Sequence, residues 1–474
     1  MKKIILLLVV AIFHLPFSIS HATVWQVGPT HTYTKPSQVS SLVQNGDTVD
    51  IDAGTYTADV CHWTANNLLL RGVGTGYAHL NANNTSYGQK GIWVIGGNNT
   101  TVRYIEFSHC HDVAAVDKNW AGIRQEGMNL TVSHCYFHDN DDGILAGTLN
   151  PSKIVIQFTE FDHNGFGDGY SHNLYINHVD TLVFRYNYSH HATIGHELKS
   201  RAHVNYILYN RLSNEATGDA SREIDMPDGG TAIVMGNIVE QGPNSTNSGI
   251  IGYGLESLTN NAPHDLYLVN NTIVNDKSSG VFVQVGNVMN IFKSRNNILA
   301  GIGAMMFGTP VTLDTASNWH PVNISSAGFV SAATYDYHLT IFSPAINSGT
   351  NAGVASNGFS LTPLMEYSHP ANSVARVVSL AIDLGAHEFG SATGVNDNSN
   401  LKDEFQYWAA EGSLTVATSI PLVVVTIYDA FGRKIIEKKI QSGISQIDVS
   451  SLSQGIYILE ARTENGAVSG KFFR

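Results

Sequence analysis

Three segments of the chain, 171–178, 195–202 and 221–228, carry charged and amide side chains at matching positions around an apolar residue. Leu174, Leu198 and Ile224 align as the inward position of a strand, so alternate residues are expected on the opposite, outer face. A soluble surface needs only scattered Ser, Thr and Asn, so this richer set predicts a site. The expected outer face holds eight residues: Asn173, Tyr175, Asn177, Glu197, Lys199, Arg201, Glu223 and Asp225.

These residue types suit the removal of a proton next to a carboxylate. Lys199 lies two residues before Arg201, and we expect it to act as the base once a substrate excludes water. Arg201 or Arg222 is expected to hold the substrate carboxylate or to protonate the leaving oxygen, because developing negative charge needs a fixed cation. The combination predicts β-elimination of a polysaccharide that contains uronic acid.

A hard cation would complete such a site. Asn173, Glu197 and Glu223 share one register on three expected neighbouring strands, which lie about 4.8 Å apart in a sheet. Unpaired carboxylates at that spacing repel, and Ca²⁺ prefers oxygen ligands. We therefore expect these three residues to hold Ca²⁺. The residues expected to bind the sugar are Tyr175, Asn177, His196, Asp225 and Tyr253.

Two other interpretations of the same charges stay open. Glu197, Glu223 and Asp225 are close enough in register to supply the carboxylate pair of a glycoside hydrolase that acts on an acidic polysaccharide. A salt-bridge ladder on a non-catalytic, glycan-binding solenoid is the third interpretation, since exposed ion pairs are common and contribute little. Only the lyase would need Lys199 and would release products with an ultraviolet-absorbing double bond.

A repeat along most of the chain must position these residues. Short β-branched and aromatic segments recur every 24 to 34 residues, with Asn, Gly and Asp at the breaks. This pattern predicts an all-β fold, a right-handed parallel β-helix with two or three strands per coil, because no 3.6-residue period is visible. The expected equivalent positions are Phe107, Phe137, Phe161, Tyr188, Leu212, Val239, Ile273 and Leu299.

Composition agrees with a β-solenoid and narrows its partners. The 44 glycines and abundant Asn suit turns with positive φ, and a hydrophobic content of 43% is enough for a continuous core. The formal net charge of -13 argues against general nucleic-acid binding. An acidic polysaccharide would then need a locally basic groove, for which Lys199, Arg201 and Arg222 are the candidates.

Histidines and cysteines are expected to be structural. His109, His111, His134, His138 and His163 recur at coil corners beside Asp and Asn, and no HExxH-like motif indicates zinc. His172, His190, His191 and His196 lie nearer the expected site, but single histidines are more often turn residues. The odd number of cysteines, Cys61, Cys110 and Cys135, favours burial as small apolar side chains over a disulfide.

The motifs "GHELKS" and, 23 residues after Lys199, "SREID" resemble those of the alginate lyase and chondroitinase B group, polysaccharide lyase family six. These proteins are parallel β-helices with a lysine base, an arginine one coil later, and calcium held by Asn and Glu. The resemblance implies the same roles for Lys199, Arg222 and the Ca²⁺ ligands named above. The resemblance covers about residues 171–242. The strand that carries Lys199 has a single acidic residue, Glu197, whereas the lysine strand of the family usually has more acidic ligand character.

Both ends of the chain indicate export. Residues 1–22 read as a signal peptide, with Lys2 and Lys3 before an apolar run and cleavage expected after Ala22. Residues 23–390 form the predicted catalytic β-helix. Its "NGDTVDIDAGTY" stretch resembles the start of many secreted β-helix proteins, where a short helix covers the first coil. No later stretch is apolar for long enough to span a bilayer.

Beyond the β-helix, residues 391–410 read as a polar linker and 411–474 as a small β-sandwich. Its "IYDAFGR", "IDVSSLSQGIY" and basic, aromatic tail resemble the C-terminal sorting domain of the type IX secretion system of Bacteroidetes. That resemblance implies a partnership with the type IX machinery and secretion or attachment to the cell surface.

Overall fold

The computed structural model describes residues 22–286, 289–378, 380–390, 405–410, 413–429, 433–453, 455–463 and 466–473. The predicted signal peptide, apart from Ala22, and residues 391–404 of the predicted linker lie outside the described residues. The chain divides into two compact units, Met1–Ser391 and Ala392–Arg474. Within the described residues, no helix is long and apolar enough to cross a membrane.

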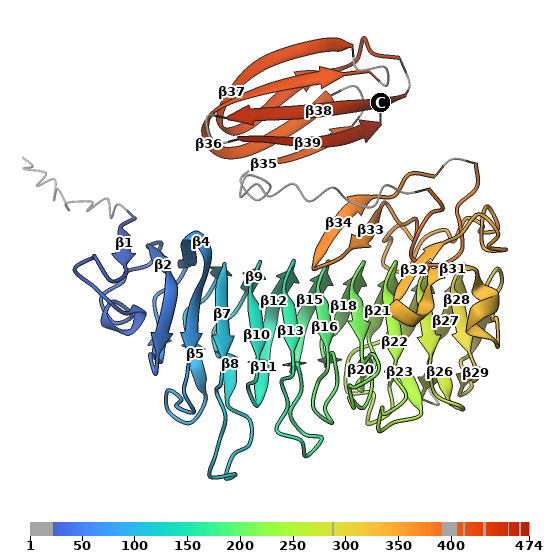
Figure 1. The fold of residues 1–474 in the computed structure, drawn as a ribbon, viewed down its shortest axis with the longest axis horizontal. Helices are drawn as coiled ribbons and strands as arrows, with labels where there is room; N and C mark the ends of the chain where they lie inside the picture. Colours follow the sequence, from blue (N-terminus) through green and yellow to red (C-terminus); the bar gives the residue numbers. More distant parts are fainter. Residues whose placement is uncertain are drawn as a thin grey trace, which may run out of the picture. The chain divides into compact units, whose positions relative to one another are not determined.

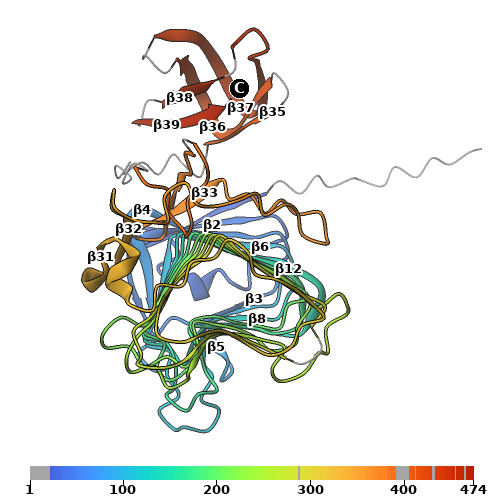
Figure 2. The same ribbon diagram turned by 90° about the vertical axis from the view of Figure 1, so that its right-hand side faces the viewer.

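The first unit is a parallel β-helix, which confirms the predicted fold class (Figure 1). Each regular coil contributes three strands, and strands of successive coils pair in parallel to form walls (Figure 2). One wall is a ten-stranded sheet: β3 (Cys61–Trp63), β5 (Gly91–Ile95), β8 (Ala121–Gln125), β11 (Asp142–Ala146), β14 (Leu174–Ile176), β17 (Lys199–Ser200), β20 (Ile224–Met226), β23 (Gly249–Tyr253), β26 (Val281–Val285) and β29 (Ala304–Phe307).

The other two strands of each coil belong to one continuous twenty-stranded sheet. Its first column holds β1 (Val24–Val27), β2 (Thr48–Thr57), β4 (Leu69–Asn81), β6 (Thr100–Arg103), β9 (Leu130–Ser133), β12 (Leu149–Gln157), β15 (Val179–Arg185), β18 (Val204–Leu208), β21 (Thr231–Met235), β24 (Asp265–Val269), β27 (Ile291–Arg295) and β30 (Thr312–Asp314). Its second column holds β7 (Ile105–Ser108), β10 (Tyr136–His138), β13 (Glu160–Asp162), β16 (Tyr188–His190), β19 (Arg211–Ser213), β22 (Ile238–Gln241), β25 (Thr272–Asn275) and β28 (Ile298–Gly301).

Aromatic stacking inside the coils follows the strand spacing. Phe107 and Phe137 stack with ring centroids 4.8 Å apart, and Phe137 and Phe161 stack at 5.1 Å. The next residue in this inward row is Ser189, which pairs with Phe161, so the expected equivalence of Tyr188 is wrong by one residue. Tyr188 faces outward instead. The serine hydroxyl is needed inside, where it donates to the backbone carbonyl of Glu197 at 2.8 Å.

A buried asparagine ladder lines the turn between the two columns of the large sheet. Each side-chain amide donates to the Oδ1 of the asparagine one coil later, at 2.8–3.1 Å, and each Oδ1 accepts a backbone N–H from the preceding coil. These bonds satisfy backbone groups that the turn leaves without sheet partners. The ladder contains Asn187, Asn210, Asn237, Asn271, Asn297 and Asn318.

The ends of the β-helix differ in detail from the sequence prediction. The expected helix over the first coil is only a 3-10 turn, η1 (Pro36–Gln38). After the last coil come η2 (Ile324–Ala327), β31 (Phe329–Ser331), η3 (Ala332–Thr334) and β32 (Asp336–Leu339), then the hairpin β33 (Met365–Ser368) and β34 (Asn372–Ala375). All three cysteines are buried and free of disulfides, as predicted.

Residues 350–371 form a strap that runs back along the coils. Thr350 binds Asn296 in the last coils, with its N–H 2.9 Å from Oδ1. Leu364 donates its N–H to the hydroxyl of Tyr209 at 3.1 Å, several coils earlier. The strap therefore ties together coils that contact only their neighbours otherwise.

The second unit is a five-stranded antiparallel sheet of β35 (Phe405–Ala410), β36 (Ser413–Tyr428), β37 (Lys434–Asp448), β38 (Ile456–Thr463) and β39 (Gly466–Phe473). Its core includes Leu414, Val425, Ile427 and Leu459, all fully buried. Because β35 pairs with β36, the sheet of this unit begins at Phe405, within the predicted linker of residues 391–410.

Candidate active site

The predicted register of the charged segments is confirmed. Tyr175 on β14 pairs with Lys199 on β17, which pairs with Asp225 on β20. The next position in the row is Gly252 on β23. A Cβ atom there would lie 2.6 Å from Oδ1 of Asp225, so glycine leaves the space that this carboxylate fills.

Lys199 and Arg201 converge on one carboxylate, that of Glu256. The Lys199 Nζ lies 2.9 Å from Oε1 of Glu256 and 4.0 Å from Oδ2 of Asp225. Arg201 donates through NH2 to the other oxygen of Glu256 and through Nε to the hydroxyl of Tyr175, at 2.8 Å. Both cations also lie over the Tyr175 ring, 5.7 and 5.8 Å from its centroid. An amine and a guanidinium therefore bind one carboxylate group, and both cations also contact the same tyrosine ring.

Glu256 reaches this position from the loop that follows β23. The loop is held by the backbone N–H of Glu256 on the carbonyl of Pro227, at 3.3 Å, and by the Ser257 hydroxyl on Asp228, at 2.7 Å. Half of the Glu256 side chain remains exposed, whereas that of Lys199 is only 13% exposed. The carboxylate thus covers the two cations from the solvent side.

Asp228 forms the other border of the site. It accepts a hydrogen bond from NH1 of Arg201 at 2.8 Å, and its second oxygen lies 2.8 Å from Nε2 of His178. Burial works to raise the pKa of Asp228, but hydrogen bonds from Ser257 and Arg201 outweigh it and hold the pKa below its usual value. Asn177 orients His178 by accepting its N–H, so the predicted sugar-binding role of Asn177 becomes indirect.

Arg222 lies away from Arg201. It donates to the carbonyl of Gly249 at 3.1 Å and to Oε1 of Gln284 at 3.2 Å, both on later coils. Its Nε is 3.7 Å from Oδ1 of Asp225. Arg222 therefore reaches the site only through Asp225, whose pKa burial raises against the opposing charge of Lys199.

His196 has a structural contact on one ring nitrogen and faces the site with the other. Its Nδ1 accepts the backbone N–H of Arg222 at 3.2 Å, and its ring stacks on His172 with centroids 4.8 Å apart. Burial, helped by Lys199 and Arg222, lowers the pKa of His196 to about 3. The neutral ring presents Nε2 toward Asp225, at 3.7 Å.

The expected outer-face position of Asn173, Glu197 and Glu223 is wrong, since all three are fully buried. Each precedes the first residue of its strand, where strict alternation does not apply. Asn173 donates to Oε2 of Glu197 at 2.5 Å and accepts from Asn164, and Glu197 also accepts the N–H of Ala192 at 2.9 Å. These hydrogen bonds satisfy buried polar groups on the inner side of a coil corner.

These three residues do not fit the predicted calcium site. Both carboxyl groups are fully buried, and burial raises the pKa of Glu197 to about 7 and that of Glu223 well above its usual value. One oxygen of Glu223 has no hydrogen-bond partner, but the side chain is sealed from the surface. Tyr253 is also wrong as a sugar-binding residue: it is fully buried and donates to the carbonyl of Gly230.

Sequence reasoning missed Glu256, Asp228 and His178. His178 and Asp228 are the last residues of segments 171–178 and 221–228, two residues past β14 and β20, and the alternation rule left them off the expected outer face. Glu256 carries no local signal, because its position depends on how its loop returns over two earlier coils. The predicted basic groove is accordingly closed by three carboxylates: Asp225, Asp228 and Glu256.

Comparison with known proteins identifies one part of the chain by family. Residues 410–473 match the family model of the secretion system C-terminal sorting domain. A comparison with curated proteins gave no match. Among solved structures, that of pectate lyase Pel9A aligns with 78% of this chain and 98% of that chain, at 15% identity and a TM-score of 0.46. The sorting domain directs the chain through type IX export to the cell surface or the medium, as predicted.

Proposed function

We propose that this exported β-helix is a polysaccharide lyase that cleaves a uronic-acid-containing polymer by β-elimination. The observation that carries the proposal is the binding of one carboxylate, that of Glu256, between Lys199 and Arg201, two cations that both lie over the Tyr175 ring. A uronate carboxylate has the same chemistry and would bind to Lys199 and Arg201 when the Glu256 loop moves away. The tyrosine ring offers an apolar face for a sugar.

Each step has a residue in reach. Arg201 stays cationic, because hydrogen bonds to Glu256 and Asp228 raise its pKa against the effect of burial, and it neutralises the substrate carboxylate. Lys199 accepts the proton α to that carboxylate, and the electron pair forms the new carbon–carbon double bond. The glycosidic C–O bond breaks, and the leaving oxygen takes a proton. Tyr175 is placed to supply it, since its oxygen accepts from Arg201 and leaves its own O–H free to donate.

Burial weakens the hydrolase alternative. Glu197 and Glu223 were two of its three expected carboxylates, and neither reaches the surface. Products with new reducing ends and no double bond would nevertheless move the assignment to a hydrolase. Binding of an acidic polymer without any product would indicate a glycan-binding protein.

The test is the purified exported chain incubated with alginate, polygalacturonate and chondroitin, followed by the ultraviolet absorbance of unsaturated products. Lys199→Arg keeps the positive charge but removes the amine that accepts the proton. We expect it to lower kcat by about 10²–10⁴-fold, the usual contribution of a general base. Lys153→Arg on β12 is the matched control at an exposed lysine and should leave the rate unchanged. Full activity of Lys199→Arg would contradict the role of Lys199.

Chelation provides a separate test of the calcium prediction. Because Arg201 supplies the positive charge that neutralises the substrate carboxylate and the predicted calcium ligands are buried, we expect elimination to persist in EDTA. Loss of activity on chelation, restored by Ca²⁺ alone, would show that other oxygen ligands hold the cation.

A further inference from the structure

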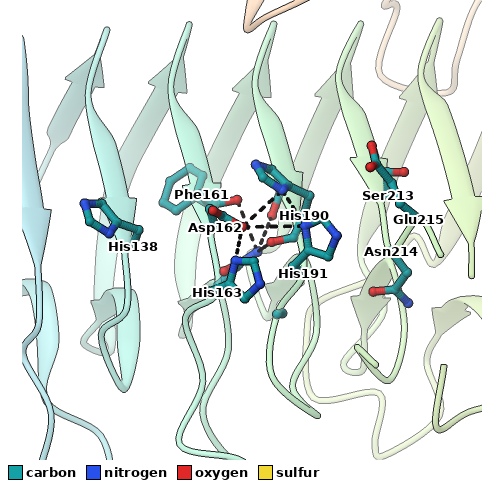
Figure 3. A network of polar contacts seen from close by, with 12 residues as sticks. His138, Phe161, Asp162, His163, His190, His191, Ser213, Asn214 and Glu215 are labelled. Atoms are coloured by element: carbon teal, nitrogen blue, oxygen red, sulfur yellow. Dashed lines mark hydrogen bonds and ion pairs between the residues drawn. The ribbon is translucent and has the colours of Figure 1, made fainter. Parts of the chain in front are cut away.

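A second polar cluster lies on the outer surface of β13 and β16, in the large sheet rather than the ten-stranded one (Figure 3). Asp162 is its centre. Its Oδ1 lies 2.5 Å from Nδ1 of His163, 3.1 Å from Nδ1 of His190 and 3.6 Å from Nδ1 of His191. The Nδ1 atoms of His190 and His191 are 2.7 Å apart. One carboxylate oxygen and three imidazole nitrogens thus meet at the surface.

The backbone explains how neighbouring residues reach the same side. Asp162 and His190 are paired across β13 and β16, so their side chains lie one above the other. In a regular strand the following residue would point to the opposite face. His163 and His191 instead have positive φ angles of 50° and 54°, which turn their side chains beside those of Asp162 and His190. Their rings stack with centroids 4.9 Å apart.

The Nε2 atom of His190 contacts a carboxylate, and this contact determines the protonation of Nδ1 on the same ring. Its Nε2 lies 3.2 Å from Oε1 of Glu160. When Nε2 carries the proton, Nδ1 of His190 is unprotonated, and its lone pair points at Asp162 and His191. A carboxylate behind a ligating histidine is a common feature of metal sites, because it fixes the tautomer and the ring orientation.

The separations suit a small transition-metal ion. A tetrahedral Zn²⁺ with bonds of about 2.0–2.1 Å has ligand atoms about 3.3 Å apart. Among Asp162, His190 and His191 the three separations are 2.7, 3.1 and 3.6 Å. Shifts of a few tenths of an ångström would bring them to that value. The three side chains are 9–19% exposed, so an ion can enter from solvent and water can occupy the fourth position.

We propose that Asp162, His190 and His191 bind one divalent transition-metal ion, with Zn²⁺ as the best fit, and that Glu160 supports the site from behind His190. Imidazole nitrogens with one carboxylate oxygen suit Zn²⁺ better than Ca²⁺ or Mg²⁺. The ion would join two successive coils, because Asp162 belongs to one coil and His190 and His191 belong to the next. Its binding stabilises the folded chain by RT ln(1 + c/Kd), where c is the free Zn²⁺ concentration.

A neighbouring group must be separated from this site in any experiment. His79, Glu106 and His138 also offer three ligand atoms within 4.8 Å of one another. There each histidine contacts Glu106, at 3.4 and 3.0 Å, and no short contact between the two histidines is recorded in the described residues. Glu106→Gln removes the carboxylate of this group. It is combined throughout with His138→Gln, which disrupts a third group, His109, His138 and Asp139, whose ligand atoms also lie within 4.8 Å of one another.

The test is a Zn²⁺ titration of the full chain by calorimetry, with Co²⁺ absorbance as a second reading and the melting temperature with and without Zn²⁺ as a third. We expect the variant with both Glu106→Gln and His138→Gln to retain one equivalent bound by the proposed site. Adding His191→Gln or Asp162→Asn should then remove that equivalent and the Co²⁺ bands. Glu160→Gln should weaken binding by about tenfold or more without removing it.

His134→Gln is the matched control, because His134 also has a positive φ, of 53°, but lies outside the cluster. It should bind Zn²⁺ as the parent does. The proposal is overturned if the parent binds no Zn²⁺, or if His191→Gln and Asp162→Asn, each folded by circular dichroism, bind it as tightly as His134→Gln. The cluster would then be a hydrogen-bonded ladder alone.

Discussion

Glu197 places a carboxyl group inside the wall of the β-helix, where every oxygen contact comes from the protein. Burial raises its pKa from 4.5 to about 7, against hydrogen bonds from Ala192, Ser189 and Asn173 that lower it. The folded chain therefore holds a proton that the unfolded chain releases near pH 4.5. The contribution of this group to stability is present below that pH and is lost as the pH rises through 7.

This sign leads to a prediction for Glu197→Gln. The amide keeps the shape and has no proton to lose, so the variant should be more stable than the parent above pH 7 by up to roughly 3 kcal/mol. Below pH 4.5 the two should differ little from this cause. Urea unfolding at pH 5 and pH 8 measures the difference, with Glu126→Gln at a half-exposed position as control. An equal gap at both pH values would show that folding does not raise the pKa of Glu197.

His138 also has a raised pKa, but the cause is hydrogen bonding to carboxylates rather than burial. Burial lowers its pKa, but hydrogen bonds to Asp139 and Glu106 outweigh this and raise it to about 9. Its favourable contribution is complete below about pH 6.5 and disappears as the pH rises through 9. We expect the parent chain to lose about 1–3 kcal/mol between these values, and His138→Gln to lose less. Thermal melting across this pH range measures it, and parallel curves for the two proteins would contradict the assignment.

At the scale of elements, the loop after β23 controls the candidate active site. Glu256 binds the same two cations that a substrate carboxylate needs. Glu256→Gln removes a competing negative charge, so we expect KM for an acidic polymer to fall several-fold and kcat to change little. Steady-state kinetics on the best substrate measure this. A higher KM would instead make Glu256 part of the sugar-binding surface.

The asparagine ladder is the element that holds the turns of the coils. Asn237 donates to the carbonyl of Ile207 and to Asn271, and accepts the N–H of Asn210 at 2.8 Å. Asn237→Ala leaves these buried groups without partners and should cost about 2–5 kcal/mol, since each orphaned group costs about 1–3. The exposed Asn244→Ala should cost much less. Equilibrium unfolding of the two variants compares them.

At the scale of the whole molecule, the candidate active site and the sorting domain belong to separate units. The sorting domain has its own core and its own antiparallel sheet. A chain that ends at Gly390 should keep the β-helix and its activity but stay inside the cell envelope. Cell fractionation with an activity assay of each fraction tests this. Surface or medium activity equal to that of the full chain would contradict an export role for residues 405–473.

Much of this architecture was predictable from sequence, because it follows from local rules. The recurrence of Phe107, Phe137 and Phe161 indicated stacked coils, and period-two alternation placed Tyr175, Lys199 and Asp225 in one outward row. The sorting domain was visible in contiguous motifs. Where the rule was extended past a strand, as at Glu197 and Glu223, it failed, since those residues lie at a corner and serve buried backbone groups.

The sequence by itself determined the coil period, the register of three charged strands and the exported, two-unit organisation, because neighbours along the chain decide these. The tertiary structure alone decided which side chains meet. A returning loop brings Glu256 onto Lys199 and Arg201, and positive φ angles set His163 and His191 beside Asp162. These side-chain contacts depend on the conformation of the turns between strands. The turn conformation itself depends on hydrogen bonds to buried polar groups of neighbouring coils, which the local sequence pattern does not show.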